Sequence, residues 1–151
     1  MIEHPPCDQC PLSKGGEIYM LDSMVLLDMI KNPSGMAGQR FKALLGNHVD
    51  AELCTSVIVQ CELEDALSSR LNPRWMQHYH GVMEALHVLP LQSNSAPYYA
   101  SLQQHSRLSS LPIKPQNLLI AAHALAMGAI LISDKCELAQ IPGLRYQNWL
   151  S

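Results

Sequence analysis

From residue 17 onward the sequence alternates short apolar runs with segments of helical length. Ile18–Leu21 and Ile130–Ile132 are apolar runs of the length and character of buried strands. The segments between such runs are long enough for helices and end at Gly-, Pro- or Asn-containing turns. Strands that alternate with helices predict an α/β layered fold with a mainly parallel sheet, because parallel neighbours need a crossover connection.

The individual elements follow from these apolar runs and from the turn signals. We expect strands at 18–21, 53–57, 87–91, 130–133 and 144–148, and helices at 25–30, 39–45, 58–69, 75–86, 96–109 and 115–127. Residues 1–16 contain Pro, Gly and Cys and lack periodicity, so we expect an N-terminal extension before a single domain over 17–151. Neither a GxGxxG nor a GxxxxGK[ST] motif is present, so dinucleotide-binding and P-loop sites have no support.

Charge and hydropathy narrow the classes of partner. The chain has ten Lys and Arg against 13 Asp and Glu, a net charge of -3, and its basic residues form no run. Contact with nucleic acid would therefore have to be local or helped by metal ions rather than driven by a basic surface. Apolar runs stay well short of the roughly 18 residues that span a bilayer. The N-terminus lacks the order of a secretion signal, so we expect a cytoplasmic protein without membrane contact.

The five cysteines are an odd number, which in a cytoplasmic chain argues against a disulfide framework. Three of them stand in apolar segments and are expected to be small buried hydrophobes: Cys54, Cys61 and Cys136. Cys7 and Cys10, with His4 nearby, have the spacing of half a zinc site, but a second pair is missing from this segment. The alternative is two free thiols in a flexible tail.

Polar residues stand where the predicted strands end. Asp22 directly follows the first strand, Asp134 follows the fourth, and Asn117 lies in the first turn of the helix that Pro115 opens. Sites in open parallel sheets form outside the carboxyl ends of the strands, so these residues are candidates for one site. Each of them alone can also be explained as an ordinary turn, cap or local hydrogen-bonding residue.

Glu62 is the most informative single residue of the candidate set. By helical spacing it shares a face with four apolar residues: Val59, Leu63, Ala66 and Leu67. Burying a carboxylate on an apolar stripe costs several kcal/mol unless it is paired or bound to a metal. Glu64 and Asp65 fall on the other side of this helix and are expected to be solvated. The alternative for Glu62 is a place at the rim of the stripe.

Four segments, in order along the chain, resemble the PIN-domain family, and in particular its VapC-like toxins of type II toxin–antitoxin systems. Leu21–Leu26 resembles the family's LDTNVL opening, and Ser56–Leu63 its strand end followed by a helix with a Glu. Pro115–Ala124 resembles its Pro-x-Asp-Leu-Leu-Ile-Ala-Ala-His stretch, and Ile132–Asp134 a polar turn that is followed by Pro142–Leu144. The resemblance covers residues 17 to 150.

This resemblance implies a three-layer α/β/α sandwich around a mainly parallel sheet. It also implies an endoribonuclease whose acids at one sheet end bind Mg²⁺ or Mn²⁺ and cleave RNA phosphodiester bonds, often in tRNA. On the family pattern the metal ligands are Asp22, Glu62 and Asp134, the catalytic set adds Asn117, and Ser23 and Ser133 are secondary residues. A cognate antitoxin protein would be the partner, and the toxins are commonly homodimers.

The chain departs from the family pattern at the site itself. Asn117 replaces the third carboxylate and brings no negative charge, and Met24 replaces an Asn with a thioether that hard metals bind poorly. Ser23 in place of Thr keeps the hydroxyl. Two hypotheses stay open: an active nuclease with weakened metal binding, and a degenerate PIN-like domain that binds RNA or a protein partner without cutting. A third is a small α/β protein whose acids hold no metal.

Overall fold

The computed structural model describes residues 16–47, 50–69, 71–110 and 112–151. Five strands form one sheet in the order β3-β2-β1-β4-β5, and every neighbouring pair is parallel. The strands are β1 (Glu17–Leu21), β2 (Ala51–Ser56), β3 (His87–Leu89), β4 (Ile130–Ile132) and β5 (Arg145–Gln147). The predicted parallel sheet is confirmed. The predicted extension and the Cys7–Cys10 pair fall outside the described residues, apart from Gly16.

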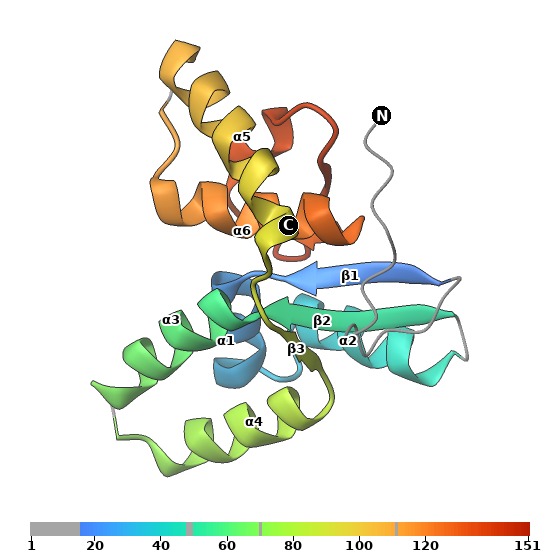
Figure 1. The fold of residues 1–151 in the computed structure, drawn as a ribbon. Helices are drawn as coiled ribbons and strands as arrows, with labels where there is room; N and C mark the ends of the chain where they lie inside the picture. Colours follow the sequence, from blue (N-terminus) through green and yellow to red (C-terminus); the bar gives the residue numbers. More distant parts are fainter. Residues whose placement is uncertain (1–15, 48–49, 70, 111) are drawn as a thin grey trace.

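Helices cover both faces of the sheet, so the predicted three-layer α/β/α architecture is also confirmed (Figure 1). In the view of Figure 1, α5 and α6 lie above the sheet, and α1 to α4 lie below it. The helices are α1 (Ser23–Lys31), α2 (Met36–Gly46), α3 (Val57–Ser68), α4 (Pro73–Glu84), α5 (Ala96–Leu108) and α6 (Pro115–Met127), with short 3-10 turns η1 (Ser93–Ser95) and η2 (Cys136–Gln140). No helix of the described ranges is long and apolar enough to cross a bilayer.

Local chemistry explains where the elements begin and end. The strand β2 stops at Ser56, one residue earlier than predicted, because the Ser56 side chain accepts a hydrogen bond from Ile58 N–H and caps α3. The strand β3 ends before Pro90, which has no N–H to donate to a neighbour. The helix α6 ends at Gly128, whose φ of 65° lies in the left-handed region that glycine adopts without strain.

The core lies on both faces of the central strands. Met20, Leu21, Leu131 and Ile132 are fully buried, as expected of parallel strands covered by helices on each side. Neither face of these strands meets water, which explains why the residues of β1 and β4 are apolar in succession rather than in alternation. Where these two buried strands end, the polar residues that follow them lie at the carboxyl edge of the sheet.

The prediction for the cysteines is only partly correct. Cys54 is buried in β2, but Cys61 and Cys136 are exposed. Cys61 stands two residues from both Val59 and Leu63, and that spacing places it on the opposite side of α3 from these buried residues. Cys136 begins the short turn η2 at the surface. An apolar neighbourhood in sequence was a poor guide here because helical position decides burial.

Candidate functional site

Asp22 lies at the carboxyl edge of the sheet, where β1 passes into α1. Its backbone N–H donates to the Ile132 carbonyl at 2.8 Å, which continues the pairing of β1 with β4 by one residue. Its carboxylate caps α1 by accepting the Ser23 N–H at 2.7 Å on Oδ1. The Asp22 side chain is fully buried. A buried carboxylate must be compensated by hydrogen bonds or positive charge, so the other partners of Asp22 determine how its charge is stabilised.

Glu62 approaches this edge from α3. Val59, Leu63 and Leu67 on the expected stripe are buried, but Ala66 is exposed and Glu62 is only half-buried. Glu62 therefore stands at the rim of the stripe, which was the alternative position considered for it. Glu64 and Asp65 are exposed, as predicted.

Ser23 links the two acids. Its hydroxyl lies 3.4 Å from Asp22 Oδ1 and 3.4 Å from Glu62 Oε2. A hydroxyl carries one proton, so Ser23 can donate to only one of these oxygens at a time, and both contacts are long. The other oxygen of Glu62, Oε1, is buried and has no hydrogen-bond partner within the described part of the chain. The structure thus brings the Asp22 and Glu62 side chains close together, and Glu62 Oε1 is available to bind a ligand.

The turn after β4 supplies two further partners of Asp22. Ser133, which is fully buried, donates its hydroxyl to Asp22 Oδ2 at 2.7 Å. Lys135 donates its ammonium to the same oxygen at 2.9 Å. Sequence reasoning missed Lys135, and the only available signal was a cation placed directly after Asp134.

Asp134 lies at the same turn, but among the described residues no hydrogen bond joins it to Asp22 or Glu62, and its Oδ1 is buried and unpartnered. Burial and then the nearby Asp134 carboxylate raise the pKa of Tyr146 in β5. Asn117 is half-buried in the first turn of α6, as predicted. Within the described ranges, no three His, Cys, Asp or Glu side chains are grouped closely enough to hold a metal.

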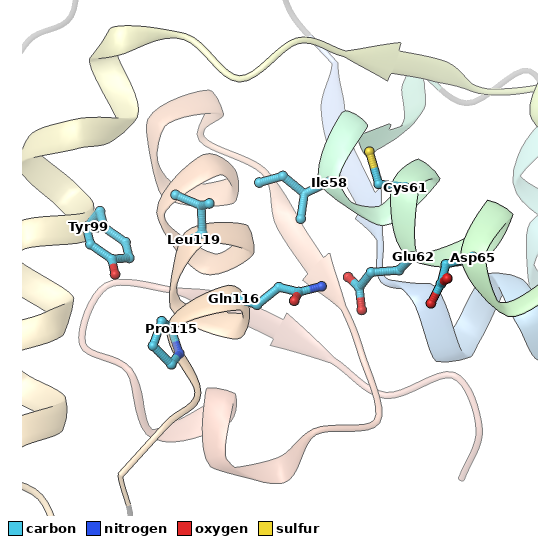
Figure 2. A pocket seen from close by; sticks show the side chains of 8 residues that line it. All are labelled: Ile58, Cys61, Glu62, Asp65, Tyr99, Pro115, Gln116 and Leu119. Atoms are coloured by element: carbon cyan, nitrogen blue, oxygen red, sulfur yellow. The ribbon is translucent and has the colours of Figure 1, made fainter.

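An open groove of about 540 Å³ runs beside Glu62, between α3, α5 and α6. Its lining residues are Ile58, Cys61, Glu62, Asp65, Tyr99, Pro115, Gln116 and Leu119. Figure 2 shows the Glu62 carboxylate and the Gln116 amide pointing toward one another across the groove. Sequence reasoning missed Gln116, because an exposed Gln in a first helical turn carries no signal of its own. Met24 does not line this groove, and 45% of its surface is exposed.

A buried His supports the start of α3 from the opposite helix layer. His123 Nδ1 lies 2.8 Å from Ser56 Oγ, the hydroxyl that caps α3. The other ring nitrogen, Nε2, is buried and has no hydrogen-bond partner among the described residues. Burial lowers the pKa of His123 below its ordinary value, and the Pro90 carbonyl opposes this effect only in part. A neutral His123 thus ties α6 to the helix that carries Glu62.

Comparison with known proteins identifies the family of this chain. The sequence pattern of the PIN domain matches residues 19–143. The chain is 28% identical over 134 residues to Ribonuclease VapC1 of Haemophilus influenzae (strain R2866), covering 87% of this chain and 98% of that protein. It is 25% identical over 133 residues to the tRNA(fMet)-specific endonuclease VapC of Shigella flexneri, covering 87% and 97%.

Solved structures agree with the sequence comparison. The fold is similar to that in the crystal structure of VapBC2 from Rickettsia felis bound to a DNA fragment from their promoter, with a TM-score of 0.78 and 25% identity over 87% of this chain and 98% of that chain. It is also similar to VapBC-1 from nontypeable H. influenzae, with a TM-score of 0.74 and 27% identity over 89% and 99%. The PIN domain match covers most of the chain. The chain belongs to the PIN-domain family.

Proposed function

We propose that this protein is a divalent-metal-dependent endoribonuclease of the toxin–antitoxin type. One observation carries the proposal: Asp22 and Glu62 meet across Ser23 at the carboxyl edge of the sheet, and Glu62 Oε1 is buried there without a hydrogen-bond partner among the described residues. An unpartnered buried carboxylate oxygen is costly unless it serves a ligand. Because relatives of this chain are named as ribonucleases, we assign to this edge the hydrolysis of RNA phosphodiester bonds.

The types of side chain at this edge suit Mg²⁺ or Mn²⁺. Hard divalent cations prefer carboxylate oxygens, and among the described residues Glu62 Oε1 and Asp134 Oδ1 are carboxylate oxygens without a hydrogen-bond partner. Asp22, Glu62 and Asp134 do not form a three-ligand cluster among the described residues, so in this proposal their side chains would have to move closer together to hold the ion. The bound ion would supply a Lewis acid for phosphodiester hydrolysis. Asn117, from the start of α6, orients a water molecule or a phosphate oxygen through its amide. Ser23 and Ser133 hold the Asp22 carboxylate in place.

The groove beside Glu62 is the proposed path of the RNA. It opens directly onto the Glu62 carboxylate, and Gln116 offers amide hydrogen bonds on its far wall (Figure 2). Because the chain has no basic run, the metal would supply much of the charge that attracts the phosphate backbone. One relative is named as specific for tRNA(fMet), which makes tRNA the first substrate to try.

The proposed protein partner is a cognate antitoxin. Two of the similar solved structures are VapBC complexes bound to DNA, from R. felis and from Salmonella typhimurium, in which a toxin is seen with its partner. We extend this arrangement to the present chain, together with a homodimer of the toxin and a cytoplasmic location. The degenerate binding module is not favoured. The relatives that align with this chain over nearly their whole length are named as a ribonuclease and a tRNA-specific endonuclease.

Two acids on the same helix provide the test of this function. Glu62→Gln removes the charge at the groove, whereas Glu64→Gln removes an exposed charge and leaves an oxygen that can still accept the Tyr79 hydroxyl, now 2.9 Å from Glu64. We expect Glu62→Gln to lower cleavage of total RNA on the order of 100-fold, the cost typical of losing one electrostatic group in an active site. Glu64→Gln should cleave like the unmodified protein. Equal cleavage by both variants would remove Glu62 from the mechanism.

A further inference from the structure

Lys135 is held inside the candidate site rather than on its surface. Its ammonium donates to Asp22 Oδ2 at 2.9 Å, and its side chain is 19% exposed while that of Asp22 is 0% exposed. Its own backbone N–H donates to Ser133 Oγ at 3.1 Å, and that hydroxyl also donates to Asp22 Oδ2. The turn thus fixes both the backbone and the charged end of Lys135 on one carboxylate oxygen.

This ion pair differs from an ordinary surface pair in the same molecule. Arg145 and Glu17 meet at 2.7 Å, but their side chains are 51% and 55% exposed, so water screens their attraction. The buried Asp22 carboxylate has no such screening by water. Its Oδ1 is taken by Ser23 and its Oδ2 by Ser133 and Lys135, so the ammonium supplies the positive charge that the buried carboxylate requires.

A divalent ion that binds Asp22 has to approach or displace this ammonium. Two cations on one carboxylate repel each other, and the repulsion is strong where solvent is excluded. With Asn117 in place of an acid, the three candidate ligands Asp22, Glu62 and Asp134 carry -3, and Lys135 reduces this to -2. Lys135 therefore lowers the attraction of the site for a divalent ion and at the same time compensates Asp22 when no ion is bound.

We propose that Lys135 is an internal counterion that competes with the divalent metal for Asp22. It stabilises the metal-free protein and weakens metal binding, so the site fills only at higher metal concentration than its carboxylates alone would require. This inference rests on the metal site of the proposed function. It concerns metal affinity and stability, which can be measured without RNA.

The test compares neutral and charged replacements of Lys135. Lys135→Met removes the charge, Lys135→Gln removes it but keeps an amide donor for Asp22, and Lys135→Arg keeps it. Lys42→Met removes a lysine that is exposed on α2 and serves as the matched control. For each protein, titration calorimetry gives the dissociation constant for Mn²⁺, and thermal unfolding in EDTA and in saturating Mn²⁺ gives the stability of the two forms.

We expect both neutral variants to bind Mn²⁺ about tenfold more tightly, to unfold at lower temperature in EDTA, and to gain more from Mn²⁺ than the unmodified protein. Lys135→Arg and Lys42→Met should stay close to it. Unchanged or weaker Mn²⁺ binding by Lys135→Gln, the gentler of the two neutral variants, would overturn the proposal.

Glu62→Gln separates this failure from that of the proposed function. If Glu62→Gln abolishes Mn²⁺ binding but the neutral Lys135 variants bind like the unmodified protein, the metal site holds and the role of Lys135 is wrong. If neither the unmodified protein nor the neutral variants bind Mn²⁺, both the metal site and the competition for it are wrong.

Discussion

At the scale of single residues, the site is organised around the compensation of one buried carboxylate. Asp22 accepts hydrogen bonds from two places in the chain: the first turn of α1, and the turn after β4 with the Ser133 hydroxyl and the Lys135 ammonium. Glu62, 40 positions later in sequence, has the opposite character, since its Oε1 lacks a partner among the described residues. One acid is therefore held in place, and the other is available for a ligand.

The sequence was informative about the acids and uninformative about their partners. Asp22 and Asp134 could be proposed because each follows an apolar strand, and the ends of parallel strands meet at one edge, whereas Ser133 was named only through the family resemblance. Lys135 could not, because a lone lysine is usually a solvated surface residue and no periodicity marks one that turns inward. The half-buried position of Glu62 was left open by its helical spacing, which fixes a face to within about 100° but not the depth of a rim residue.

Asn117 is the residue at which activity can be raised. Replacing it by Asp adds a carboxylate at the start of α6, where the helix dipole favours negative charge and the cation of the proposed site would do so as well. We expect Asn117→Asp to increase Mn²⁺-dependent RNA cleavage about tenfold, the factor that corresponds to roughly 1.4 kcal/mol. Initial cleavage rates at fixed Mn²⁺ measure this directly. A variant that folds and cleaves no faster would show that this position lies outside the metal and phosphate environment.

At the scale of helices and strands, capping and turn residues explain most boundaries. Pro115 and Gly128 marked both ends of α6 in the sequence, and the helix spans the predicted residues. The short turn η2 was missed because Cys136–Gln140 has too few residues for a helical period to show. The opposite error occurred at Cys61, where apolar neighbours in sequence masked an outward position on α3.

Two helical glycines allow a matched test of element stability. An added Cβ at Gly81 in α4 meets nothing within 4 Å, whereas one at Gly38 in α2 would lie 2.2 Å from the Pro33 carbonyl oxygen. We expect Gly81→Ala to raise the free energy of unfolding by about 0.5–1 kcal/mol through lower backbone entropy of the unfolded chain. Gly38→Ala should lower it by about 1–3 kcal/mol, because the backbone of the turn must shift.

Denaturant unfolding of both variants and the unmodified protein measures these changes. Similar effects of the two substitutions would contradict the close packing of α2 against the Pro33 turn. Neither residue lies at the carboxyl edge of the sheet, so both variants should retain the metal affinity of the unmodified protein.

At the scale of the whole molecule, the topology explains why distant residues meet. The sheet order β3-β2-β1-β4-β5 places β1 between β2 and β4, so the segments that follow all three strands reach the same edge. Asp22, the start of α3 and the Ser133 turn are brought together in this way, while Tyr99 of α5 and Pro115, Gln116 and Leu119 of α6 line the groove on the other side of Glu62 (Figure 2). Layer order was predictable from the alternation of elements, but the groove was not, because it depends on side chains from three helices.

The most direct test of the central claim is the metal dependence of RNA cleavage at this edge. The unmodified protein and Asp22→Asn would each be incubated with total RNA or tRNA in Mn²⁺, in EDTA, and in EDTA followed by excess Mn²⁺. The account predicts cleavage by the unmodified protein in Mn²⁺, its loss in EDTA, its return with excess Mn²⁺, and none of these by Asp22→Asn. Cleavage that persists in EDTA, or that Asp22→Asn carries out equally well, would contradict a metal-dependent nuclease built on Asp22.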